Sequence, residues 1–198
     1  MSDLSDYSFS KVMDYPDDPE AFYIFDFSGG YDEAFIREQG WGIGRYNEER
    51  TDMYNTPLFD GRRNIHMGID IWASAGEPVF SFWEGLVVYK QQNDNDGDYG
   101  PTIVIKYNFD NEDLFALYGH LSRESLEMVK VGGEIAKGQQ IATLGSEKVN
   151  GGWEPHLHFQ LSVDDPKEAD MPGVVSEKNR EEALEKYPDP RIILGDLY

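Results

Sequence analysis

The four histidines of the chain lie in three short segments, IHMGID, LYGHLS and PHLHF. A single histidine is usually a structural residue, so the question is whether His66, His120, His156 and His158 converge. His66, Asp70 and one histidine of the last pair would supply two imidazole nitrogens and one carboxylate oxygen. That is the protein ligand set of a catalytic zinc site, which keeps its fourth position for water. The two remaining imidazoles would be free to transfer protons or to stabilise an oxyanion.

The spacing within the first segment places a condition on the backbone. His66 and Asp70 are four residues apart, so in a flat strand their Cα atoms would lie about 13 Å apart, too far to share one ion. Gly68 stands midway and permits a bend that would bring the two side chains together. Without that bend, the segment is an edge strand with a polar outer face.

The pair His156 and His158 follows a turn-like Gly-Gly-Trp-Glu-Pro stretch and begins a β-prone segment. On a strand both imidazoles point to one side, with Cα atoms about 7 Å apart, while Leu157 points into the core. One ring can then bind a metal ion while the other reaches a molecule bound to that ion. The alternative is an exposed polar strand face. His120 ends an apolar run and indicates little by itself.

The elements that must position these residues centre on residues 59–163, which form the main domain. Their connections are too short for helical crossovers, which favours an antiparallel sheet. The stretch Asn93–Gly100 predicts a hairpin-like turn, which we expect to face solvent. The predicted strands are short, β-branched and aromatic, namely NIHMGIDIW, EPVFSF, EGLVVYKQ, PTIVIKYN, DLFALYGHL, QIATLG and HLHFQLSV.

Two further regions flank this domain. Residues 1–58 are acidic and aromatic, with a strand predicted at 21–27 and a helix at 31–40 that ends at a glycine. We expect them to pack on the core as an extension; because every candidate ligand follows residue 58, zinc binding should survive their removal. Residues 164–198 are a C-terminal tail with a helix predicted at 176–187, which begins at the N-cap Ser176.

The segments HMGID, LYGHLS and PHLHFQL resemble the signature of the LytM/lysostaphin-type zinc metallopeptidases, many of which cut peptide cross-links in bacterial cell walls. The stretches AGEPVFSFWEGLVV, DYGPTIVIKY and VKVGGEIAKGQQIATLG are also similar to that family, so the resemblance spans about residues 59–163. It implies a mainly β fold, an antiparallel sheet domain related to barrel-sandwich hybrids, with a metal-floored groove and a few peripheral helices. Gly151, Gly152 and Trp153 would line a groove wall, although Trp153 could instead be a buried loop anchor.

The resemblance also implies roles for individual residues. His66, Asp70 and His158 would bind Zn²⁺, and His120 and His156 would be the catalytic histidines on either side of the water and the scissile carbonyl. The implied activity is hydrolysis of a peptide bond in a cell-wall-type peptide or a related small peptide. Which of His120 and His156 is the general base stays open. The stretches GRYNEER, NGGWEPHLHFQ and YPDPRIIL also resemble the version of this domain found in kinase–aminotransferase-like fusions, which would favour a cytosolic substrate.

Composition excludes other classes of function. With 17 basic and 38 acidic residues the net charge is −21, which argues against binding to a nucleic-acid backbone or an anionic membrane surface. The chain has no cysteine, so disulfides, a thiolate nucleophile and cysteine metal ligands are excluded. The sequence has neither a signal-peptide pattern nor an apolar run of about 18 residues. We therefore expect no membrane span and a cytoplasmic location, or an exported one only if a signal had been removed.

Two rival functions are considered. One is a carrier domain, either lipoyl-like, with Lys130 as the modified residue, or a phosphohistidine carrier. Lys130 lacks the symmetric hairpin setting of a lipoyl site, and Asp70 would repel a phosphohistidine. The other is a catalytically inactive binding or regulatory module of the same fold. Such modules typically lack metal ligands, whereas this sequence has the full set. The oligomeric state is left open.

Overall fold

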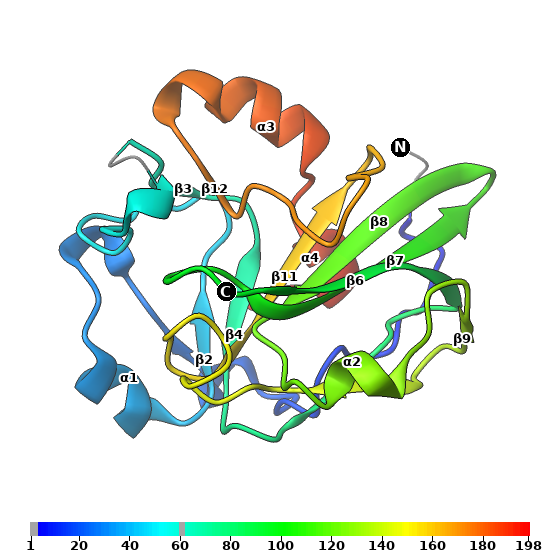
Figure 1. Ribbon diagram of the computed structural model, residues 1–198, viewed down its shortest axis with the longest axis horizontal. Coiled ribbons are helices and arrows are strands. Elements are labelled where there is room, and N and C mark those ends of the chain that lie inside the picture. The colour runs from blue at the N-terminus through cyan, green and yellow to red at the C-terminus, as the bar shows by residue number, and fades with distance from the viewer. Residues whose placement is uncertain (1–3, 60–61) are drawn as a thin grey trace.

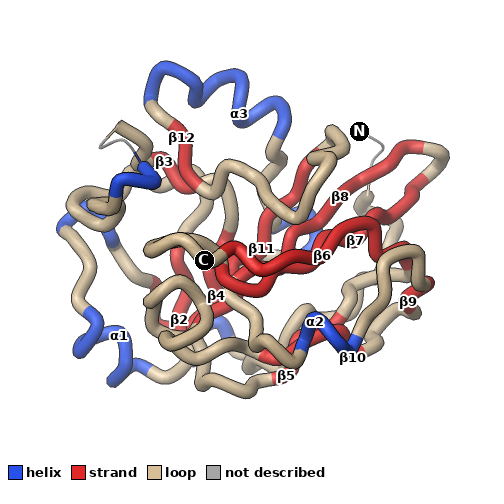
Figure 2. The backbone as a smooth tube through the Cα atoms, in the orientation of Figure 1, coloured by secondary structure: helices blue, strands red, loops and turns tan. Residues whose placement is uncertain are grey.

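The computed structural model describes residues 4–59 and 62–198, and its strands form one large sheet and two small ones (Figures 1 and 2). The large sheet has the order β1-β2-β4-β11-β8-β7-β6-β9, and the pairs β10-β5 and β12-β3 are separate. All pairs are antiparallel except β1 with β2. The predicted mainly β, antiparallel fold with few helices is therefore confirmed.

The strands of the described residues are short at both ends of the chain and long in the middle. They are β1 (Tyr23–Ile24), β2 (Gly42–Gly44), β3 (Ile65–His66), β4 (Ile69–Trp72), β5 (Pro78–Phe80), β6 (Gly85–Asn93), β7 (Gly100–Phe109), β8 (Glu112–Gly119), β9 (Glu134–Ile135), β10 (Gln140–Thr143), β11 (His156–Ser162) and β12 (Val174–Val175).

The helices are short and lie at the periphery, as Figure 1 shows for α1 and α3. They are α1 (Glu33–Gln39), α2 (Ser125–Met128), α3 (Arg180–Lys186) and α4 (Arg191–Leu194), with 3-10 turns at Pro19–Ala21, Phe27–Gly29, Pro57–Phe59 and Glu177–Asn179. Among residues 4–59 and 62–198, none of the helices is long and apolar enough to cross a bilayer.

The predicted helix at 31–40 is confirmed as α1. Asp32 caps it by accepting a hydrogen bond from the backbone N–H of Phe35, and Gly40 follows at φ 73°. The predicted C-terminal helix is wrong in its first turn. Ser176 precedes a 3-10 turn and makes no capping hydrogen bond with its side chain, and the α-helix begins only at Arg180.

Alternation along β11 separates the core from the site. Leu157, Phe159 and Leu161 are fully buried in the main apolar cluster, which also includes Ile69, Ile71 and Ile105 from neighbouring strands. The intervening residues of β11 point to the opposite face. That face is covered as well, because a second cluster packs Met171, Val175 and Tyr187 of the tail with Val104, Phe115 and Leu117 of β7 and β8. The polar residues of β11 therefore lie between the sheet and the tail.

The first 58 residues contribute strands to the large sheet. β2 pairs with β4, with Gly44 opposite Asp70, and β1 extends the sheet beyond β2. Val12, Met13 and Ile43 are fully buried in the main cluster. The N-terminal segment thus supplies one neighbour of the strand that carries Asp70.

Candidate metal centre and active site

Strand register brings Asp70 and His158 together. In the β4–β11 pairing these two residues are direct partners, and Gly119 of β8 lies opposite His158 on its other side. His66 comes from β3, which leaves the large sheet and pairs with β12 instead. The chain thus bends between His66 and Asp70, at the position of Gly68, as the metal-binding hypothesis requires.

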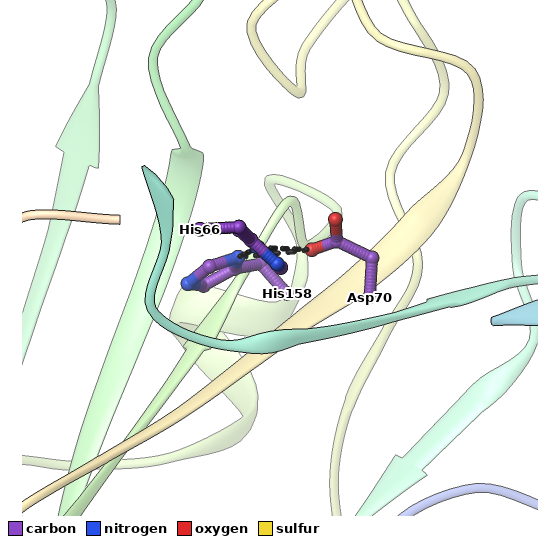
Figure 3. Close-up of side chains that lie close together, drawn as sticks. All are labelled: His66, Asp70 and His158. Carbon is purple, nitrogen blue, oxygen red and sulfur yellow. Dashed lines mark hydrogen bonds and ion pairs between the residues drawn. The ribbon is translucent and has the colours of Figure 1, made fainter. Parts of the chain in front are cut away.

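Three side-chain atoms converge at this bend (Figure 3). Oδ1 of Asp70 lies 2.9 Å from Nδ1 of His158 and 3.2 Å from Nε2 of His66, and those two nitrogens are 3.1 Å apart. These separations are close to the edges, about 3.3 Å, of a tetrahedron with metal–ligand bonds of about 2.0–2.1 Å. All three residues are almost completely buried, with at most 3% of their surface exposed.

Gly68 is required for this packing. A Cβ atom at position 68 would lie 2.6 Å from Cε1 and 2.8 Å from Nε2 of His158, and 2.9 Å from the carbonyl oxygen of Phe159. Any side chain would therefore push the His158 ring out of the cluster or bend β11. Glycine is needed here because the backbone at position 68 lies too close to the His158 ring and to β11 for a side chain.

The outer ring nitrogens fix the tautomers of both histidines. Nδ1 of His66 donates to the carbonyl oxygen of Arg45 at 2.8 Å, because a carbonyl can only accept. Nε2 of His158 donates to Oε1 of Gln160 at 2.9 Å, since the amide nitrogen of Gln160 donates to the carbonyl oxygen of Pro172. A neutral ring with its proton on the outer nitrogen offers a lone pair on the inner one.

The two inner nitrogens and Oδ1 of Asp70 thus lie within about hydrogen-bond distance of one another. Burial lowers the pKa of His66 to about 4, so its ring is neutral near pH 7. Burial alone would raise the pKa of Asp70, but His66 and Arg50 lower it well below its usual range. A cation placed among these three atoms would take the place of the hydrogen bonds between them, and two imidazoles with one carboxylate suit zinc. The residues fit the metal that the sequence predicted.

His120 and His156 lie beside this cluster, with their rings 4.2 Å apart between centroids. Nδ1 of His120 donates to the carbonyl oxygen of Asn150 at 2.8 Å, and Nδ1 of His156 donates to that of Glu154 at 2.7 Å. Each ring therefore keeps a lone pair on Nε2. Burial lowers the pKa of His156 to about 4 and that of His120 well below its usual value. Both rings are neutral and able to accept a proton.

Packing holds these two rings in place. Trp72, the strand partner of His156, stacks on the His156 ring at 4.6 Å between centroids and 20° between planes. His120 has φ 61°, an uncommon left-handed conformation for a residue other than glycine. Its backbone is fixed on both sides, because its N–H donates to Tyr99 and its carbonyl accepts from Gly145. Such a conformation needs this support to persist.

A pocket of about 480 Å³ opens over the five residues. Trp153 lines it and is also anchored, because its indole N–H donates to the carbonyl oxygen of Gly97 and its ring packs against Tyr31 and Tyr54. The two interpretations of Trp153 are therefore compatible. The 93–100 loop faces solvent at residues 94–96, as expected, but residues 95 and 97–99 also line the pocket, because the loop pairs with the Gly151 turn.

Sequence reasoning missed three residues that contact the cluster. Gln160 orients His158, Tyr99 packs against the rings of His120 and His158, and Arg50 donates to Asp70. Gln160 had a signal in the sequence, because it is the next residue on the same strand face after His156 and His158. Arg50 and Tyr99 lie in the stretches GRYNEER and DYGPTIVIKY, but no spacing links them to the histidines, since loops bring them to the site.

The comparison with known families agrees with this geometry. The model of peptidase family M23 matches residues 64–171, more than half of the chain, and the chain belongs to this family. The resemblance to LytM/lysostaphin-type peptidases is thereby confirmed. The match includes all five residues of the site and ends within the tail.

Individual relatives match at lower coverage. The peptidoglycan DD-endopeptidase ShyC of Vibrio cholerae is 28% identical over 144 residues, which are 64% of this chain and 30% of ShyC. Lipoprotein NlpD of Yersinia enterocolitica is 36% identical over 92 residues, 46% of this chain and 84% of NlpD. The solved catalytic domain of lysostaphin from Staphylococcus simulans is 22% identical, with a TM-score of 0.48 over 75% of this chain and 96% of that one. The chain thus spans under a third of ShyC.

Proposed function

We propose that the chain is a zinc-dependent endopeptidase that hydrolyses a peptide bond in a peptidoglycan-derived or related short peptide. The observation that carries the proposal is the convergence of three buried ligand atoms, on His66, Asp70 and His158, which lie within 3.2 Å of one another. These residues would hold the ion. A zinc ion in such a site polarises a carbonyl and acidifies water.

His120 and His156 would carry the proton transfers. Each presents an unprotonated Nε2, fixed by the hydrogen bond of its Nδ1 to a backbone carbonyl. One ring can take the proton of the attacking water, and the other, once protonated, can stabilise the oxyanion or protonate the leaving amine. Because each ring presents Nε2 in the same way, the hydrogen bonds do not assign the two roles between them.

The substrate class rests on relatives and on the pocket. ShyC is named a peptidoglycan DD-endopeptidase, which supports a cross-link peptide as the substrate. A pocket of about 480 Å³ with aromatic and charged walls suits a few residues of a peptide. The carrier alternatives explain none of the histidine contacts. The inactive-module alternative is disfavoured because the metal ligands and both flanking histidines are present together.

The first test measures metal and activity in the same preparation. Elemental analysis of the full chain, purified without chelator, should give about one zinc per chain, and Asp70→Ala should give little because two protein ligands remain. Asp113→Ala, which changes an exposed aspartate of β8, should keep the zinc. Soluble cross-linked muropeptides and a short-peptide library, analysed by mass spectrometry, would then reveal the bond cleaved.

Two outcomes would overturn the proposal. Full zinc content in Asp70→Ala would break the ligand assignment. A wild-type chain that stays metal-free after zinc is added would instead favour a carrier or an inactive module, and phosphohistidine or a protein partner would be sought next.

A further inference from the structure

The two oxygens of Asp70 have different neighbours. Oδ1 faces the two imidazoles, whereas the other oxygen points away from them (Figure 3). That outer oxygen, Oδ2, accepts a hydrogen bond of 2.7 Å from Nη1 of Arg50. Arg50 is only 1% exposed, so this ion pair is shielded from solvent. Charge-assisted hydrogen bonds of this kind are stronger than neutral ones.

The backbone ties Arg50 to the strand that carries His66. The N–H of Arg50 donates to the carbonyl oxygen of Asn64 at 2.8 Å, and the N–H of His66 donates to that of Glu48 at 3.0 Å. Residues 47–50 therefore pair with residues 64–66 immediately before the bend at Gly68. Arg50 and His66 thus lie on two short segments that are hydrogen-bonded to each other.

Glu48 fixes the other side of the guanidinium. Nε of Arg50 donates to Oε2 of Glu48 at 3.0 Å, and the second oxygen of Glu48 accepts from Arg45 at 2.7 Å and from the N–H of Phe27 at 3.3 Å. Arg50 thus bridges two buried carboxylates, which would otherwise repel each other. Its rigid planar fork can contact both, as a single ammonium group would not in the same geometry.

A carboxylate ligand with a free second oxygen can rotate or turn both oxygens toward an ion. We propose that Arg50 is a positioning residue of the metal site, which holds Oδ2 of Asp70 so that Oδ1 stays directed at His66 and His158. Partners of this kind typically change metal affinity by about 10–100-fold when they are lost. The inference rests on the zinc-binding part of the proposed function.

The test compares two arginines of the same network in the full chain. Arg50→Met and Arg45→Met remove the same charge, and both side chains contact Glu48, but only Arg50 touches Asp70. The dissociation constant for zinc would be measured by competition with a chromophoric chelator. Arg50→Met should bind zinc about 10–100-fold more weakly than wild type. Arg45→Met should stay within about threefold, because the Arg45 side chain is partly exposed and the backbone carbonyl that accepts from His66 remains.

The melting temperature of the metal-free proteins separates positioning from stability. A purely structural arginine would lower that temperature and leave the zinc affinity of the folded protein unchanged, a result that overturns the inference. If Arg50→Met does not fold, the zinc affinity of Arg50→Lys is the test, because lysine keeps the positive charge but lacks the planar guanidinium that contacts two carboxylates. Zinc affinity about fivefold or more below wild type supports positioning, and smaller changes overturn it. A wild-type chain without zinc affinity would overturn the proposed function and this inference together.

Discussion

At the scale of single residues, we expect metal binding and proton transfer to depend on different side chains. His120 makes no contact with the Asp70 carboxylate in the described structure; its ring nitrogen bonds Asn150 instead. We therefore expect His120→Ala to retain zinc and to lose peptidase activity by about 10²–10⁴-fold, as for loss of an acid–base group. Zinc content and the initial rate on one cleavable peptide, measured on the same sample, test this.

The comparison with Asp70→Ala sharpens that prediction. Both variants should be inactive, but only Asp70→Ala should be metal-free. An unchanged rate in His120→Ala would remove this residue from the mechanism. A His120→Ala protein without zinc would show that the ring holds the site together rather than reacting.

Sequence reasoning was most successful for residues in regular strands. Period-two alternation correctly placed His156 and His158 on one face and Leu157 in the core, because β11 is a regular strand between two partners. It missed Arg50, which reaches Asp70 from 20 positions earlier through a loop. No local pattern encodes such a contact, since it depends on how residues 47–50 pair with β3.

At the scale of elements, the junction between β3 and β4 is the most constrained point of the site. Gly68→Ala would place a methyl group 2.6 Å from the ring of His158. We expect zinc affinity to fall by about tenfold or more, in line with other changes that displace a ligand. Gly29→Ala is the control, because an added Cβ there meets nothing within 4 Å.

A chelator-competition assay on both glycine variants measures this effect. Equal zinc affinity in Gly68→Ala and Gly29→Ala would mean that β11 shifts to accommodate the added methyl group without loss of zinc binding. The close packing at the bend would then not position His158.

The N-terminal strands lead to a different expectation from that of the sequence alone. The sequence suggested that zinc binding survives removal of residues 1–58, since every ligand follows them. In the structure β2 pairs with β4, and Arg50 lies behind Asp70. We now expect the 59–198 fragment to lose zinc and most of its fixed tertiary structure.

Zinc content and near-ultraviolet circular dichroism of the fragment check this expectation. Adding the separate 1–58 segment should restore part of both signals, because the missing strands can pair again. A fragment that holds one zinc per chain and keeps native dichroism would contradict the role assigned to β2.

At the scale of the whole molecule, buried neutral histidines couple stability to pH. In the metal-free protein burial lowers the pKa of His66 and His156 from 6.5 to about 4. Between these values the unfolded chain binds more protons than the folded one, so stability falls as pH falls from about 6.5 to 4. The loss is on the order of 3 kcal/mol for each histidine across the whole window.

Urea unfolding in chelator at pH 7 and pH 4.5 measures this loss. His156→Asn keeps a donor for the carbonyl oxygen of Glu154 but cannot titrate. The variant should therefore lose less stability than wild type between the two pH values, while the protonation of acidic residues affects both proteins alike. Identical losses would contradict a buried, titrating His156.

The prediction of strands from the sequence succeeded for the long strands and missed the two-residue strands β9 and β12. β6, β7 and β8 appear in the sequence as β-branched and aromatic runs, and all three form. β9 and β12 have two residues each, too few to show any period. Their pairing depends on tertiary contacts. The pairing of β12 with β3 is part of how the tail covers the site.

The pairing of β12 with β3 also determines when the site can form. His66 and His158 are separated by 92 positions, and the strand that holds His66 pairs with Val174 and Val175. Contacts between such distant segments form late in folding. During synthesis, which proceeds from the N-terminus, the ligands cannot be held by this pairing before residues 174–175 have left the ribosome. A nascent chain should therefore have no complete site until residues 174–175 have emerged and paired with β3.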